Sequence, residues 1–136
     1  MLIDREDELK KLTSRVLGAA MEVHSILGPG YLESVYEESL AQEFEIRDIP
    51  YERQKTINLS YKGHKVGESR LDFLVDDILI VELKAVEQIS PIHTAQVLSY
   101  LKTTGLYLGI VINFNVVSLK SGIKRVIKSS NYQATP

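Results

Sequence analysis

Charged side chains interrupt two apolar stretches near the middle of the chain, where a buried strand would exclude them. Asp72 stands within the apolar segment 71–75, and Glu82 and Lys84 fall in the second half of the run 78–85. Burying an ion is costly unless it is paired or bound, so these charges need an explanation. Two carboxylates that converge beside a lysine suit a divalent cation and an attacking water, which indicates metal-assisted hydrolysis. A Glu–Lys pair at the exposed end of a strand is the alternative interpretation.

The register of the two strands decides whether these carboxylates can meet. Side chains alternate along a strand, which gives one face with Ile78, Ile80, Glu82 and Lys84 and another with Leu79, Val81, Leu83 and Ala85. If Asp76-Asp77 alone formed a two-residue loop, Asp72 would lie opposite Val81 and on the wrong face. We therefore predict an odd number of loop residues or a bulge, either of which brings Asp72 opposite Glu82.

A helix predicted over 91–104 supplies further candidates. Ser90 and the proline after it are an N-cap and a first helical residue. His93, Gln96 and Tyr100 then recur at spacings of three and four, which places them on one face. Such a face can orient a metal-bound water and a phosphate. An ordinary solvent-facing stripe is the alternative.

Two residues nearer the start of the chain are weaker candidates. Glu33, in a helix predicted over 32–46, precedes Tyr36 by three and lies near the apolar side, so its carboxylate can point inward. Glutamates in a first helical turn are also common because they complement the helix dipole. His24, at the end of the preceding helix, is interpreted as a structural histidine.

The elements that must position these groups follow from the hydrophobic periodicity. Apolar residues recur at threes and fours over 6–27, and Gly28-Pro29-Gly30 ends that helix. Alternating segments predict the strands, at 56–61, at a stretch ending in 71–75, at 78–85, at 106–114, and at 116–127 as a strand or a strand plus helix. The order α-α-β-β-β-α-β-β predicts an α/β fold, a mixed sheet flanked by helices. We expect one domain over 1–136, with a disordered tail from about residue 129.

Composition sets the broad class. The chain of 136 residues is 44% hydrophobic and 25% charged, the proportions of a globular protein, and it has no cysteine, which excludes disulfides and thiolate chemistry. The charged start and the short apolar runs predict no membrane span, and we expect a cytoplasmic location. A net charge of −2 weakens an expectation of nucleic-acid binding. Lys120, Lys124, Arg125 and Lys128 could gather positive charge on one side of the last element, or form a solvated edge.

The segment Gly30-Tyr31-Leu32-Glu33-Ser34-Val35-Tyr36 matches the signature Gly-x-x-Glu-x-x-Tyr. Together with Glu82-Leu83-Lys84 and Asn113-Phe114-Asn115, it resembles the GxxExxY protein family, which is grouped with the PD-(D/E)XK nuclease superfamily. The likeness spans nearly the whole chain. It implies a restriction-endonuclease-like core.

The resemblance also implies roles for the candidate residues. Asp72 corresponds to the acidic residue of the second core strand, Glu82 and Lys84 to the E-x-K pair, and Gln96 and Tyr100 to a Q-x-x-x-Y element. Glu33 is similar to the first-helix glutamate of the superfamily. One departure is Leu71, which stands where the superfamily's name has proline.

The function implied is a metal-dependent nuclease. Mg²⁺ or Mn²⁺ would be held by Asp72, Glu82, Glu33 and the carbonyl of Leu83, and the partner would be nucleic acid, DNA before RNA. The alternative is a nuclease-fold binding or interaction module without turnover. A homo-oligomer stays open, because one sequence does not address it.

Overall fold

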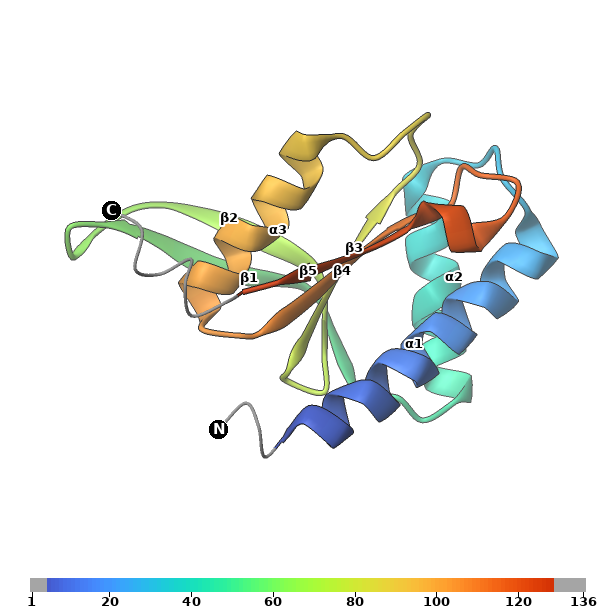
Figure 1. Cartoon of the computed structure of the whole chain (residues 1–136), viewed down its shortest axis with the longest axis horizontal. Coiled ribbons are helices and arrows are strands. Elements are labelled where there is room, and N and C mark those ends of the chain that lie inside the picture. Colours follow the sequence, from blue (N-terminus) through green and yellow to red (C-terminus); the bar gives the residue numbers. More distant parts are fainter. Residues whose placement is uncertain (1–4, 129–136) are drawn as a thin grey trace.

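A five-stranded mixed sheet runs through the middle of the molecule, in the order β1-β2-β3-β4-β5 (Figure 1). The computed structural model describes residues 5–128. The strands are β1 (Tyr51–Tyr61), β2 (His64–Val75), β3 (Leu79–Lys84), β4 (Leu108–Asn113) and β5 (Ile123–Ile127). Neighbouring strands are antiparallel except β3 and β4, which are parallel. A parallel pair needs a crossover connection, and α3 (Pro91–Thr104) provides it.

Helices cover both faces of this sheet. α1 (Glu6–Leu27) and α2 (Glu33–Ile46) lie on one face and α3 lies on the other, while the short helix η2 (Leu119–Gly122) precedes β5 (Figure 1). The core on the α1/α2 face includes Phe44, Phe73 and Leu83. The core on the α3 face includes Ile80 and Leu101. The central strand β3 is therefore apolar on both faces until its charged end, as expected of a strand covered from both sides.

The predicted order and fold class are confirmed. α1 spans the predicted residues, α2 begins one residue later than predicted, and α3 matches 91–104. The segment 116–127 contains both a short helix and a strand. The expected tail from about residue 129 lies outside the described residues. Within residues 5–128, no helix has the length and apolarity needed to cross a membrane.

The long β1–β2 hairpin is broken near its open end, far from the turn at Lys62 and Gly63. Arg53 pairs with Phe73 and Lys55 pairs with Leu71, while Gln54 and Asp72 between them are left out of the pairing. Leu71 packs on the α3 face and Phe73 on the α1/α2 face, although residues two apart in an unbroken strand share a face. The hairpin therefore exchanges its buried face at Gln54 and Asp72.

The β2–β3 connection has the odd length that was predicted. Val75 pairs with Leu79, and Asp76, Asp77 and Ile78 form the loop between them. The same register, extended along both strands, brings Asp72 opposite Glu82. One detail of the prediction is wrong, because Ile78 packs in the core on the α1/α2 face rather than with Ile80. Ile78 precedes β3, so strand alternation does not govern it.

Candidate active site

Asp72 and Glu82 hold each other's strands together through their carboxylates. Glu82 Oε2 accepts a hydrogen bond from the backbone N–H of Asp72 at 2.7 Å. Asp72 Oδ2 accepts one from the backbone N–H of Leu83 at 2.8 Å. Each carboxylate therefore keeps one oxygen fixed by the main chain of the facing strand. The second oxygens, Asp72 Oδ1 and Glu82 Oε1, have no backbone donor among these contacts.

Burial makes the negative charge of this pair costly. The Glu82 side chain is buried, and its pKa is raised to about 8 by burial and then by the charge of Asp72. The pKa of Asp72 is also raised, mainly by burial, although the Leu83 N–H opposes the shift. Lys84 lowers both pKa values without offsetting burial. The pair is thus short of positive charge.

Lys84 ends β3, two residues beyond Glu82. Among the ion pairs of the described residues, none joins Lys84 to Glu82, and the two side chains interact only at longer range. The alternative of a direct Glu82–Lys84 ion pair is therefore wrong. The charge of Lys84 also lowers the pKa values of Asp72 and Glu33, so it acts on all three carboxyl groups.

Glu33 approaches from the first turn of α2. Its pKa is raised by burial and then by the charge of Asp72, which places it in electrostatic contact with the strand residues. Tyr36 fixes the chain before this turn, because its hydroxyl donates to the Gly28 carbonyl at 2.6 Å and accepts from the Tyr31 N–H at 3.2 Å. The Tyr36 ring also stacks on Phe114. The tyrosine of the Gly-x-x-Glu-x-x-Tyr segment thus sets the position at which α2 begins.

The predicted polar stripe of α3 divides into three environments. Tyr100 is buried, and its hydroxyl accepts a hydrogen bond from Ser69 Oγ at 3.0 Å. The pKa of Tyr100 is raised by burial, and the charges of Glu82 and Asp72 raise it further. Gln96 is exposed one turn earlier. His93 accepts the Ser90 N–H through Nδ1 at 3.1 Å, a helix-capping contact. Only Tyr100 is thus built into the site, and a uniformly solvent-facing stripe is excluded.

Two residues near the site are not indicated as functional by any pattern in the sequence. Gln54 Nε2 donates to Glu37 Oε1 at 3.1 Å and lies 3.5 Å from Asp72 Oδ1. Asn113 is buried and binds both backbone groups of Val86, which fixes the chain just after β3. A glutamine in an alternating strand and an asparagine after a buried one are ordinary patterns, so spacing alone would not single them out.

The remaining predicted residues have structural or peripheral places. His24 Nε2 is 2.8 Å from the Val116 carbonyl oxygen, the structural contact predicted for it. Leu83 enters the site through its N–H, and a role for its carbonyl stays a prediction. Lys124 and Arg125 are neighbours on β5 and so point to opposite faces. Arg125 therefore does not share a side with Lys124, and because both are exposed they suit the alternative interpretation of a solvated edge.

The donor set fits a hard divalent cation. Within residues 5–128, no three Asp, Glu, His or Cys side chains are arranged so that they could hold a metal ion. Mg²⁺, however, usually binds through one or two carboxylates, several waters and the substrate phosphate. Asp72 and Glu82 supply two such carboxylates, half-buried and buried respectively, and the pKa of each is raised mainly by burial.

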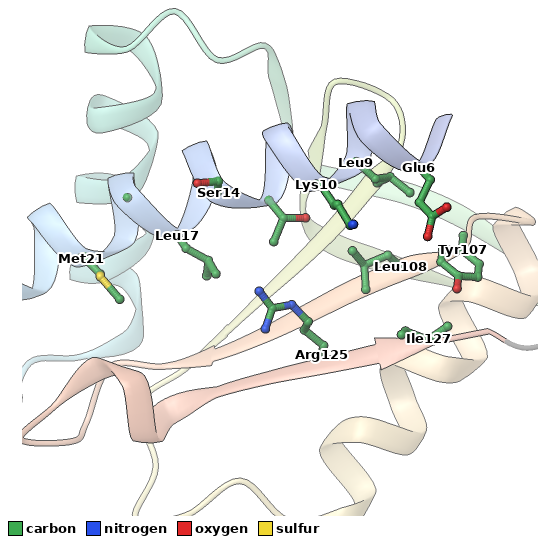
Figure 2. Close-up of a pocket in the computed structure, with 12 residues that line it drawn as sticks. Glu6, Leu9, Lys10, Ser14, Leu17, Met21, Tyr107, Leu108, Arg125 and Ile127 are labelled. Carbon is green, nitrogen blue, oxygen red and sulfur yellow. The ribbon is translucent and has the colours of Figure 1, made fainter. Parts of the chain in front are cut away.

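An open cavity of about 610 Å³ lies elsewhere, between α1 and the strands β4 and β5. Figure 2 shows Leu17, Lys10 and Arg125 reaching into it from these elements. Its wall is mostly apolar, and it includes none of the carboxyl groups described above. The cavity and the candidate active site are therefore separate features.

Comparison with known proteins assigns the family. No curated protein and no solved structure matches the chain. A family model described as the PD-(D/E)XK nuclease superfamily matches residues 10–126, a span that contains Glu33, Asp72, Glu82, Lys84, Gln96 and Tyr100. With a mixed sheet covered on both faces and acidic groups on its second and third strands, the chain belongs to the PD-(D/E)XK nuclease superfamily.

Proposed function

We propose that this chain is a metal-dependent nuclease that hydrolyses phosphodiester bonds of nucleic acid, with DNA preferred to RNA. The observation that carries the proposal is the carboxyl pair of half-buried Asp72 and buried Glu82, each held by a backbone N–H of the facing strand. Their raised pKa values are consistent with uncompensated negative charge. A divalent cation would supply the missing charge. Membership of a nuclease superfamily supports the same function.

Asp72 and Glu82 would hold the ion through the oxygens that the main chain leaves free, with Glu33 and the Leu83 carbonyl as further ligands. The expected ion is Mg²⁺, or Mn²⁺ in its place. When bound, it acts as a Lewis acid on the phosphate and lowers the pKa of a bound water.

The remaining residues would bind and orient the reactants. The ammonium of Lys84, near the carboxyl groups, would hold the attacking water in place and favour its deprotonated form. The Tyr100 hydroxyl accepts a hydrogen bond from Ser69, so its own hydrogen is not used in that contact. This hydrogen would be donated to a phosphate oxygen. Gln96, exposed one turn earlier on α3, would contact the same phosphate.

A polar hollow next to α3 supports a nucleic-acid substrate. It has a volume of about 490 Å³ and lies between β1 and α3. Its lining is rich in hydroxyl and amide groups and contains one lysine: Asn58, Ser60, Ser99, Lys102 and Thr103. Such groups bind phosphate and sugar oxygens without reading the base sequence. A strand of nucleic acid would run along this hollow to Tyr100.

The test is cleavage of single- and double-stranded DNA and RNA with Mg²⁺ or Mn²⁺. Lys84→Ala and Asp72→Asn should each abolish cleavage. Lys62→Ala in the hairpin turn and Asp7→Asn on exposed α1 are the matched controls, and both should cleave as the parent does. If Lys84→Ala and Asp72→Asn also keep the parental rate, the activity belongs to another site or to a contaminant.

A binding module without turnover is the second candidate. This candidate is favoured because, within residues 5–128, no three His, Cys, Asp or Glu side chains are arranged so that they could hold a metal ion. Titration with MgCl₂ separates the two functions. Metal binding with cleavage supports the nuclease, whereas intact folding with no metal affinity and no cleavage supports the module.

A further inference from the structure

Gln54 has a backbone conformation that is unusual for its place in the fold. Its φ is +51° although it lies within β1, between the paired residues Arg53 and Lys55. Residues other than glycine seldom adopt this left-handed region, and those that do cluster at functional sites. Lys62 and Asp76 also have positive φ, but each lies in a turn. A positive φ within a strand therefore requires a structural or functional explanation.

The strained backbone directs the Gln54 side chain between two carboxylates. Nε2 lies 3.1 Å from Glu37 Oε1 on α2 and 3.5 Å from Asp72 Oδ1 on β2. The neighbouring residue Arg53 also links β1 to α2, because its guanidinium binds Glu37 Oε2 at 3.0 Å and Glu38 Oε2 at 2.7 Å. Both oxygens of Glu37 are thus occupied, and the break in β1 is anchored to α2.

We propose that Gln54 is a positioning residue that orients the Asp72 carboxylate toward the metal ion. This inference rests on the proposed function. The Leu83 N–H holds Oδ2 at 2.8 Å and the exposed Gln54 amide faces Oδ1 at 3.5 Å, so each oxygen of the carboxylate has a donor group beside it. Oδ1 keeps a second lone pair for the cation. Outer contacts of this kind typically govern metal affinity by about 10- to 100-fold.

A purely structural role would not require an amide. Glycine adopts positive φ without strain, so it would suit the break in β1 better than glutamine. Methionine has the length and shape of glutamine and keeps the strain, but it cannot donate. Gln54→Gly and Gln54→Met therefore share one defect, the lost donor, and differ in backbone strain.

The experiment is calorimetric titration of the full chain with MnCl₂, with unfolding midpoints measured in EDTA. Lys62→Gly is the matched control, because it relieves a positive φ in a turn that is remote from the carboxylates. We expect both Gln54 variants to bind Mn²⁺ about 10- to 100-fold more weakly. We expect Gln54→Gly to unfold no earlier than Gln54→Met, and Lys62→Gly to bind Mn²⁺ as the parent does. Parental affinity in Gln54→Met would overturn the proposal.

A double-mutant cycle with Asp72→Asn in EDTA tests the contact without any metal. If Gln54 orients Asp72, the effects of Gln54→Met and Asp72→Asn on the unfolding midpoint are not additive, and additive effects overturn the proposal. A parent that binds no Mn²⁺ removes the proposed function instead. The cycle then decides alone whether Gln54 positions Asp72.

Discussion

Asp72 donates its backbone N–H to Glu82 Oε2 across 2.7 Å, while its own carboxylate accepts from the residue after Glu82. Side chains thus replace main-chain pairing where β2 and β3 reach the site. Each carboxylate is oriented by the strand that carries the other one. A substitution at either residue consequently disturbs both, and the two should be treated as one unit in mutagenesis.

Stability without metal should fall as pH rises. The folded-state pKa of Glu82 is about 8, above its ordinary value of 4.5, so the folded chain retains a proton that the unfolded chain loses between these values. Stability is therefore greatest below the lower value and declines until about pH 8, by an amount on the order of a few kcal/mol. Urea unfolding in EDTA across this window measures the slope. Glu82→Gln should flatten most of it, whereas Glu22→Gln, an exposed control on α1, should not.

Divalent metal should stabilise the parent chain. An ion that binds only the folded state adds about 2.7 kcal/mol at a concentration of a hundred times its dissociation constant. Thermal unfolding with MnCl₂ against EDTA checks this. Asp72→Asn should abolish the stabilisation and Asp7→Asn should retain it. Equal stabilisation of all three proteins would mean that the ion binds elsewhere.

Tyr100→Phe should lower cleavage more than stability. Its hydroxyl accepts from Ser69, so its loss costs about 1 kcal/mol of folding free energy. The lost donor to phosphate should reduce kcat by roughly tenfold or more at saturating metal. Tyr61→Phe, at the exposed hairpin end, is the matched control. A parental kcat for Tyr100→Phe would remove this tyrosine from the machinery.

Gly109→Ala should displace α3 from the sheet. A Cβ at Gly109 would meet Val97 Cγ1 at 2.5 Å, so the helix carrying Tyr100 must move. The overpacking should cost about 1–3 kcal/mol in urea unfolding and slow cleavage. Gly67→Ala, whose Cβ would meet Leu59 Cδ1 at an ordinary 3.9 Å, should show neither cleavage loss nor a comparable destabilisation.

The helices and the loop that position the site could be predicted from the sequence, because local patterns determine them. The limits of α1 and α3 follow from periodicity and end residues, and the odd β2–β3 loop follows from charges that had to share a face. Gln54 could not be found this way. Glutamine has no preference for positive φ, and its partners come from α2 and β2, which only the tertiary fold brings together. Alternation also failed at Ile78, where the chain has not yet entered the strand.

The break at Gln54 and Asp72 also separates the β1–β2 hairpin into two parts with different freedom to evolve. The inner part contacts α2 and is constrained by the carboxyl groups there. The outer part ends in the turn at Lys62 and Gly63, and residues added in pairs at that turn would leave every partner around Asp72 unchanged. Natural variation or engineering can therefore lengthen this arm without rebuilding the carboxyl pair or the contacts that hold it.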